Sequence, residues 1–238
     1  MNKKKRIMVL DVEGLSTCRP YNIGWIIGDK HGNIYSEESM AILPCIWENL
    51  QNCFCAKEMT HKNVEEILSD IENETEIRKY VYNSVKDAKK KMLETLIANN
   101  VSEIWAYNCP FDKSSIKRLC GEDWVMINNL VTCYDIIPAI LHTKLLTKKY
   151  VNFCNDNGYV TEKGNIQTKA EIVYRYLKND KTFEEEHTGL SDCKIEYEIL
   201  LTAIRTKKKI EKQSPPAWRI LKQFCEANEI EIKIPVGE

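Results

Sequence analysis

Five residues of types that bind metal ions or move protons stand in three separated segments of the chain. They are Asp11 and Glu13, then Asp112, then His187 and Asp192. The residues around each carboxylate are apolar in a pattern that predicts burial or partial burial. A buried carboxylate needs a proton, a partner or a metal ion, because an uncompensated buried charge is costly. Four carboxylates and a histidine could hold divalent cations and activate a water molecule, which is the chemistry that cuts phosphodiester bonds.

Each of these signals has a plainer explanation when it is taken alone. Asp11 and Glu13 could be acidic residues at a solvated strand end. Asp112 could offset the macrodipole at a helix N-terminus. His187 could be a surface residue that follows three glutamates. Only the occurrence of all five in this order favours a single site.

The segments that carry these residues predict a sheet with helices. Residues 7–13 form a strand in which Val9, Asp11 and Glu13 share one face, and apolar residues on both faces predict a central position. Strands at 21–28 and 33–43, joined by a hairpin turn at 29–32, make an antiparallel meander with it.

The rest of the chain alternates between the two kinds of element. We expect residues 44–63 to be irregular and residues 104–108 and 125–132 to be strands. A helix starts at Pro110, where proline is tolerated. The remaining helices are expected at 76–98, 134–141, 149–157, 169–177, 187–207 and 217–227. Strands first, then strands alternating with helices, indicate an α/β domain with a mixed sheet flanked by helices.

Composition is ordinary for a globular protein, with 238 residues, 43% of them hydrophobic and 29% charged. The net charge of −1 gives no bulk argument for nucleic-acid binding, so such binding would use local patches. No apolar run is long enough to span a membrane, and the first one is interrupted at Asp11, so we expect a cytoplasmic protein with no membrane partner. The main domain is expected at 1–210, followed by a helical extension at 211–238.

The chain has ten cysteines, and their scattered placement in apolar runs is typical of small core residues in a reducing compartment. Cys45, Cys53, Cys55 and His61 are zinc-ligand types. Their spacing lacks the paired C-x2-C knuckle, so the cluster is not expected to bind zinc.

In their order and spacing, the motifs resemble those of the DEDDh 3'-5' exonucleases, a proofreading-exonuclease superfamily with a ribonuclease H-like fold. Asp11-Val12-Glu13 matches the family's D-x-E motif, residues 108–112 match its N-x-x-F-D motif, and residues 187–192 match its H-x4-D motif. Residues 21–25 resemble the family's second strand, and residues 134–136 resemble a segment that often follows the second motif. Two positions depart from the pattern: Gly14 stands where Thr or Ser is common, and Gly189 where Ala is common.

The resemblance implies a site with two divalent metal ions, Mg²⁺ or Mn²⁺. Asp11 would bridge both ions, Glu13 and Asp192 would complete one, and Asp112 would hold the other, mostly through water. His187 would deprotonate the attacking water.

The resemblance also implies a substrate. It would be single-stranded or frayed 3' ends of DNA or RNA, released as 5'-mononucleotides. Gly14, Leu15 and Asn108 would contact this substrate.

Two other functions stay open. A non-catalytic nucleic-acid-binding or scaffolding relative of the same fold is one, although binding alone has no physical need for four converging acids. A ribonuclease H-type endonuclease is the other, and the close spacing of Asp11 and Glu13 disfavours it, because that fold usually spreads its first two acids over different elements.

Overall fold

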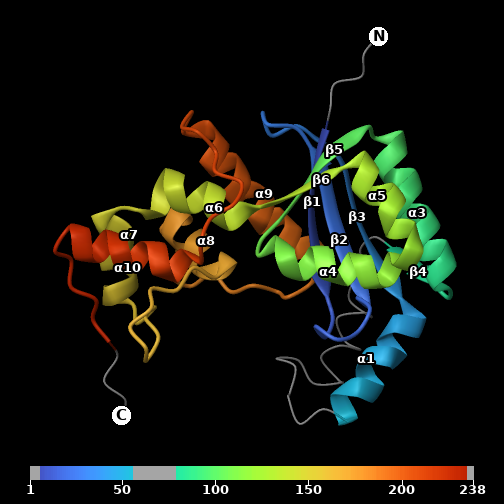
Figure 1. Cartoon of the computed structure of the whole chain (residues 1–238), viewed down its shortest axis with the longest axis horizontal. Helices are drawn as coiled ribbons and strands as arrows, with labels where there is room; N and C mark the ends of the chain where they lie inside the picture. The colour runs from blue at the N-terminus through green and yellow to red at the C-terminus, as the bar shows by residue number, and fades with distance from the viewer. Residues whose placement is uncertain (1–5, 56–78, 235–238) are drawn as a thin grey trace. The chain divides into compact units, whose positions relative to one another are not determined.

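The computed structural model describes residues 6–55 and 79–234 (Figure 1). It contains a six-stranded mixed sheet with the strand order β4-β3-β2-β1-β5-β6. The strands are β1 (Arg6–Glu13), β2 (Asn22–Gly28), β3 (Ile34–Ile42), β4 (Lys79–Tyr82), β5 (Val101–Ala106) and β6 (Thr132–Asp135). β1 pairs antiparallel with β2 and parallel with β5, β2 pairs antiparallel with β3, and β3 pairs parallel with β4. The predicted α/β class, the meander and the central position of β1 are confirmed.

Helices alternate with these strands along the chain, and further helices follow the last strand. They are α1 (Leu43–Cys55), α3 (Val85–Ala98), α4 (Cys109–Cys120), α5 (Trp124–Leu130), α6 (Ile136–Ile140), α7 (Lys148–Asp156), α8 (Ala170–Lys178), α9 (Gly189–Arg205) and α10 (Ala217–Ala227). A short 3-10 helix precedes α5, and a π-helical turn follows α6. In the described part of the chain, no helix combines the length and the apolar content needed to cross a lipid bilayer.

The chain forms two compact units. The first comprises Met1–Tyr134 and Glu186–Lys194, and the second comprises Asp135–Glu185 and Ile195–Glu238. α9 begins in the first unit and continues into the second, and α10 belongs to the second. The predicted domain boundary at residue 210 stays a prediction. All five candidate residues belong to the first unit, so its sheet positions the site.

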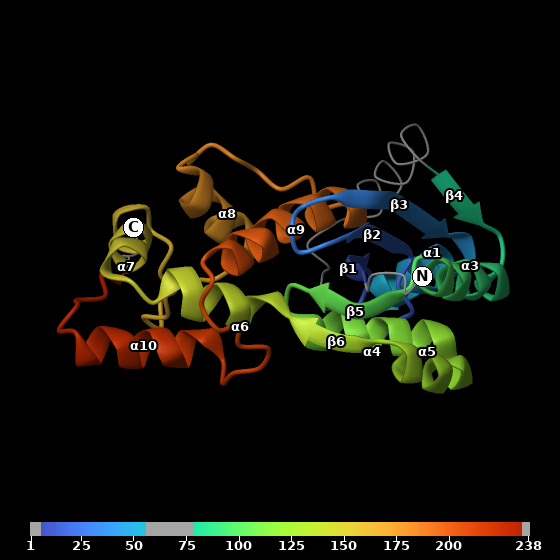
Figure 2. The same cartoon turned by 90° about the horizontal axis from the view of Figure 1, so that it is seen from above.

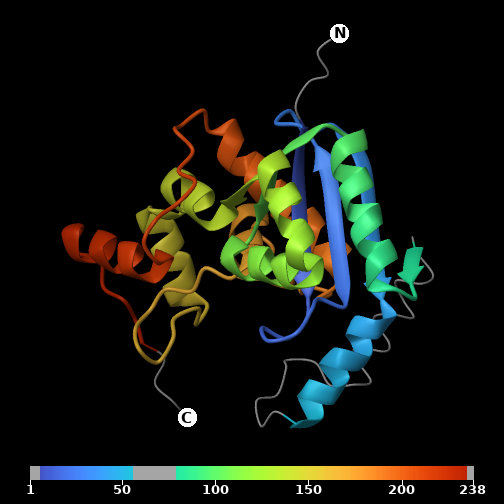
Figure 3. The same ribbon diagram turned by 45° about the vertical axis from the view of Figure 1, so that its right-hand side comes forward.

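The two faces of β1 have different partners. Met8, Leu10 and Val12 alternate along the strand and enter the main hydrophobic core together with Met92 of α3 and Ile116 of α4. Figures 2 and 3 show three of the helices that contribute to this core, α3, α4 and α5, beside the strands. The other face of β1 carries Val9, Asp11 and Glu13, because side chains alternate along a strand. The core therefore leaves the two carboxylates on the opposite side.

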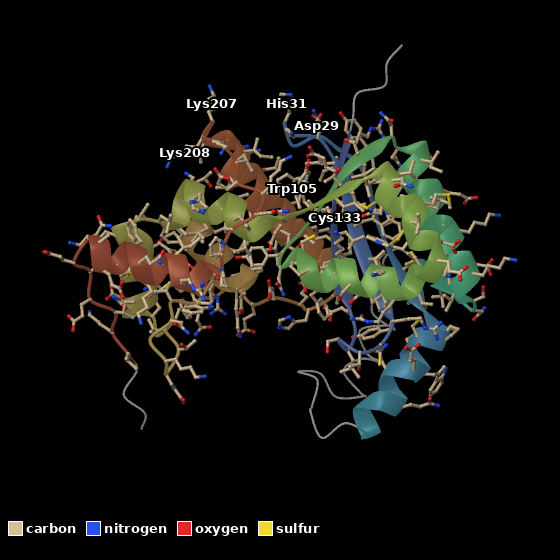
Figure 4. The ribbon with its side chains drawn as sticks, viewed as in Figure 1. Asp29, His31, Trp105, Cys133, Lys207 and Lys208 are labelled. Atoms are coloured by element: carbon tan, nitrogen blue, oxygen red, sulfur yellow. The ribbon has the colours of Figure 1, made fainter. Side chains whose placement is uncertain are left out.

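The hairpin turn between β2 and β3 is held by one side chain. Asp29, labelled in Figure 4, accepts hydrogen bonds from the backbone N–H groups of His31 and Asn33 at 2.8 Å and 3.2 Å. The side chains of Asn33 and Tyr35 also donate to it. The hydrogen bond from the Asn33 side chain has the largest effect. Together these bonds favour the ionised carboxylate and lower the pKa of Asp29 well below its ordinary value. The predicted turn is thereby confirmed.

Two predictions about the segment between β3 and β5 are wrong. Residues 44–55 are not irregular, because α1 covers Leu43–Cys55, and residues 56–63 lie outside the part of the chain that the structure describes. Cys45, Ile46 and Asn49 give that helix a buried face at helical spacing, and Pro44 lies in its first turn, where the missing N–H is tolerated. The helix expected at 76–98 begins only at Val85, because the residues of β4 pair with Ser39–Ile42 of β3 instead.

The strand expected at 125–132 is also wrong over most of its length. Residues 124–130 form α5, and the strand β6 begins only at Thr132. Trp124 and Ile127 are buried one turn apart, whereas Val125 is 66% exposed. The apolar residues of this segment predict that part of it is buried. The buried residues are spaced as on one face of a helix and do not alternate as they would along a strand.

Candidate metal centre

The first pair of carboxylates lies at the C-terminal end of the central strand. Asp11 and Glu13 are two residues apart on β1, so both point to the face opposite the main core. Both are half-buried. Across the strand pair, Asp11 stands opposite Gly24 and Glu13 opposite Asn22 of β2. Gly24 carries no side chain, so the neighbouring strand leaves room beside Asp11.

The third carboxylate comes from the first turn of α9. Asp192 is 8% exposed, and its backbone N–H donates to the carbonyl of Thr188 at 2.9 Å. Thr188 also accepts a hydrogen bond with its side-chain oxygen from the N–H of Ser191 at 3.4 Å. A hydroxyl that binds the N–H three residues later is the usual N-cap of a helix, and an acidic residue is favoured in the first turn by the helix dipole. Local sequence thus sets where the helix starts and which residue its first turn presents.

Two glycines let the start of α9 contact the sheet. A Cβ atom at Gly24 would overlap the carbonyl group of Gly189 and the nitrogen of Leu190. A Cβ atom at Gly189 would lie 2.5 Å from Asn22 Oδ1 and 2.6 Å from the nitrogen of Gly24. Both distances are shorter than real Cβ contacts, so both positions require glycine at this approach.

Hydrogen bonds fix the same contact. The backbone N–H of Gly189 donates to Asn22 Oδ1 at 3.1 Å, and the thiol of Cys193 donates to the carbonyl of Val9 at 3.6 Å. Asn22 is 4% exposed, so its amide lies in the contact and not on the surface. These bonds hold Asp192 over the face of β1 that carries Asp11.

The result is a close group of three carboxylates. Asp11, Glu13 and Asp192 each offer an oxygen, and these three atoms all lie within 4.8 Å of one another. The Oδ2 atom of Asp11 is buried. Like charges at this separation disfavour one another's ionised form, so the group favours a bound cation or a proton. Carboxylate oxygens without thiolates fit Mg²⁺ or Mn²⁺ better than zinc.

Asp112 occupies the first turn of α4 and is 3% exposed. It is buried as the sequence predicts, and α4 packs against β1. Among the described residues, however, the set of carboxylates within 4.8 Å of one another does not include Asp112. Its predicted role in holding a second ion stays a prediction.

His187 directly precedes the cap residue of α9. Its side chain is exposed, and its backbone has a φ of 54°, the left-handed region. Histidine enters that region more readily than most residues other than glycine, at a cost in backbone energy. The turn made there leads the chain into α9. His187 is not part of the carboxylate group, and its predicted role as the base stays a prediction.

The expected substrate residues Gly14 and Leu15 lie in the loop after β1. The N–H of Leu15 donates to Asn49 Oδ1 at 2.7 Å, so this backbone group is used inside the protein. A Cβ atom at Gly14 would lie 3.1 Å from the Cα of Pro20. Asn108, the third expected substrate residue, is exposed at the N-cap of α4 with a φ of 63° and makes no side-chain cap bond. The predicted substrate contacts of all three stay predictions.

Three residues that hold this loop were missed by the sequence analysis. Asn49 donates to the carbonyl of Arg19 at 2.7 Å, and Glu48 pairs with the Arg19 side chain at 2.6 Å. Arg118 of α4 donates to the carbonyl of Cys18 at 3.0 Å. The sequence could have pointed to Asn49, because it follows Cys45 by four residues and Ile46 by three and so lies at helical spacing from both.

Of the cysteine and histidine cluster considered for zinc, the structure describes one side chain. Cys45 is buried, and burial raises the pKa of its thiol to about 11. Cys53, Cys55 and His61 lie outside the residues whose side chains are described.

Comparison of the chain with protein-family models and with curated proteins gives no match.

Proposed function

We propose that the chain is a metal-dependent 3'-5' exonuclease of the DEDDh type, with a ribonuclease H-like fold, acting on single-stranded or frayed ends of DNA or RNA. The observation that carries the proposal is the group of three carboxylates, Asp11, Glu13 and Asp192, with oxygens within 4.8 Å of one another. Two come from the end of the central strand and one from a helix start that glycines bring onto the same face. Such convergence is costly without a cation, so it supports a metal centre over a structural role.

In this proposal, the carboxylates bind the metal ions and His187 acts as the general base. Asp11, Glu13 and Asp192 hold Mg²⁺ or Mn²⁺, and Asp112 contributes from the first turn of α4. Bound divalent ions lower the pKa of water and stabilise charge on the attacking and leaving oxygens of a phosphodiester. His187 accepts the proton of the attacking water at a ring nitrogen, and its exposed position at the start of α9 is compatible with access to solvent.

The direct test is an activity panel on the purified protein. The substrates are single-stranded DNA, duplex DNA, single-stranded RNA and hybrids, each labelled at the 3' or the 5' end, with Mg²⁺ or Mn²⁺. We expect stepwise shortening from the 3' end with mononucleotide products, and no cleavage in EDTA. Binding without cleavage in any metal would instead support the non-catalytic relative, and oligomeric products would support an endonuclease.

Variants of His187 test the base. His187→Ala should slow cleavage by about 10²–10⁴-fold, because general-base catalysis contributes on that scale. His187→Asn is the matched control for the backbone, since asparagine tolerates the left-handed conformation. Both variants should lose activity to a similar extent while the rise in Tm on Mn²⁺ binding stays. Full activity in His187→Asn would mean that His187 is needed for the backbone turn before α9 and does not act as the general base.

A further inference from the structure

We propose that a groove in the second unit binds an aliphatic polyamine, a chain of methylene groups interrupted by ammonium groups. The groove lies between the C-terminal half of α10 and the segment that follows this helix (Figure 1). Its volume is about 450 Å³, within the range of small-molecule sites, and it is open to solvent. The residues that line it are Lys222, Cys225, Glu226, Glu229, Ile230, Glu231 and Ile232.

Hydrogen bonds hold the segment that forms the second wall of the groove. After α10 the chain turns, and the N–H of Ile230 donates to the carbonyl of Cys225 at 2.9 Å. Asn155 of α7 then binds this segment with both atoms of its amide. Its Nδ2 donates to the carbonyl of Glu231 at 2.8 Å, and its Oδ1 accepts from the N–H of Lys233 at 2.9 Å. The groove is therefore fixed by the fold, because one wall is a helix and the other is tied to α7.

The floor of the groove is apolar. Cys225 is 2% exposed, and Ile230 and Ile232, which line the groove with it, are half-buried. Methylene groups gain free energy when they leave water for such a surface. The floor therefore favours a ligand with an aliphatic part over a bare inorganic cation.

The charge around this floor is negative. Glu226, Glu229 and Glu231 are exposed glutamates, and among the described residues that line the groove only Lys222 opposes them. Burial, and then the charge of Glu226, raises the pKa of the Cys225 thiol, so this carboxylate acts on the floor itself. Charges of one sign along a cleft with apolar walls concentrate ions of the opposite sign. The groove therefore attracts cations.

The apolar floor and the acidic rim together define the ligand. A metal ion would pair with the carboxylates and leave the floor unused, whereas a neutral apolar molecule would leave the carboxylates without a counter-charge. A polyamine such as spermidine meets both, because short methylene chains separate its ammonium groups. Lysine side chains use the same arrangement when they lay their methylene stems on an apolar surface and keep the ammonium group in water.

The experiment is isothermal titration of the full chain with spermidine in metal-free buffer. We expect saturable binding that is weaker by at least about 3-fold in the double variant Glu226→Gln/Glu229→Gln, the scale of two exposed ion pairs. Glu162→Gln is the matched control, since Glu162 is an exposed glutamate of the same unit outside the groove. Thermal unfolding confirms that each variant is folded. Equal affinity in the wild type and the double variant would overturn the proposal.

A second ligand tests the apolar floor. Hexaamminecobalt(III) carries the same charge as spermidine but has no methylene groups, so we expect it to bind more weakly. Ile232→Ser should weaken spermidine binding and leave hexaamminecobalt(III) binding unchanged. Equal affinity of the two ligands would mean that the floor has no part in binding and that the ligand class is wrong. Tighter binding of trilysine than of spermidine would replace the polyamine with a basic peptide.

The same titration on Asp192→Asn separates the groove from the proposed metal centre, whose carboxylates could also attract a polyamine. We expect unchanged spermidine affinity in this variant. Binding that is lost in Asp192→Asn and kept in the double glutamine variant would place the ligand at the metal centre and overturn the proposal. No nucleic acid is present in these titrations, so their outcome does not depend on the proposed nuclease activity.

Discussion

At the residue scale, the proposed metal centre predicts how the protein responds to metal ions. Three carboxylates with oxygens within 4.8 Å of one another repel when no cation is bound. At about 4 Å, a pair of like charges costs about 1–4 kcal/mol for effective dielectric constants between about 80 and 20. The favourable interaction of Asp192 with the helix dipole, about 0.3–1 kcal/mol, is smaller than the upper part of that range.

Asp192→Asn should therefore raise the Tm of the metal-free protein and remove its response to Mn²⁺. Each 1 kcal/mol gained corresponds to about 2–4 °C in a domain of this size. The measurement is thermal unfolding with and without Mn²⁺, because a ligand that binds the folded state raises Tm. The matched control is Asp156→Asn, whose side chain is 63% exposed. An unchanged Mn²⁺ response in Asp192→Asn would contradict the metal centre.

Glu185 gives a pH dependence that is separate from metal. Burial, and then the neighbouring charge of Glu171, raises the pKa of Glu185 from 4.5 to about 7. Because the folded pKa is raised, the folded state favours the protonated form. Its contribution to stability is full below about pH 4.5 and is lost as pH rises through about 7.

Glu185→Gln keeps the neutral form at every pH. Its Tm should match the wild type near pH 4.5 and exceed it at pH 8, as followed by thermal unfolding across this range. Glu184→Gln is the control, since Glu184 is exposed. An equal Tm difference at both pH values would mean that the substitution acts through packing and not through titration.

At the element scale, the contact between β2 and α9 depends on the absence of side chains. Gly24→Ala places a methyl group on the backbone of Gly189 and Leu190, and Gly189→Ala places one against Asn22. Overpacking of this kind typically costs about 1–3 kcal/mol, and here backbone would have to move. The displaced start of α9 would carry Asp192 away from Asp11.

We expect both alanine variants to lower Tm and to lose most of the Mn²⁺ response. Gly158→Ala is the matched control, because its added methyl meets nothing within 4 Å and it keeps only the strain of a φ of +72°. That strain costs about 1–2 kcal/mol without touching the site. A Gly24→Ala protein with wild-type Tm and metal response would show that the close approach does not position the site.

The elements that the sequence predicts well are those whose local pattern and tertiary role agree. The alternation along β1, the turn at Asp29 and the start of α9 each follow from residues close in sequence. β4 and α5 were mispredicted because pairing with β3 overrode a helical pattern in one case, and helical burial of Trp124 and Ile127 overrode an apolar run in the other.

At the scale of the whole molecule, the chain forms two compact units that share α9. All of the candidate ligands belong to the unit made of Met1–Tyr134 and Glu186–Lys194. The free energy of local unfolding differs from one region of a structure to another. A ligand that stabilises one region therefore need not protect another region from hydrogen exchange.

Hydrogen exchange with and without Mn²⁺ tests where the ion acts. We expect slower exchange at the end of β1 and in the first turn of α9, and unchanged exchange in α7 and α10 of the second unit. The Asp192→Asn protein should show no such difference. Protection confined to α7 or α10 would locate the metal response away from the proposed site.

The sequence by itself determined which residues could do the chemistry and which local elements carry them. Asp11 and Glu13 share a face because a strand repeats every two residues, and Asp192 enters the first turn of α9 because Thr188 caps that helix. Only the tertiary structure decided that these carboxylates meet. The approach of Gly24 to Gly189 and the hydrogen bond to Asn22 join segments far apart in the chain, and no local pattern encodes a contact that depends on two missing side chains.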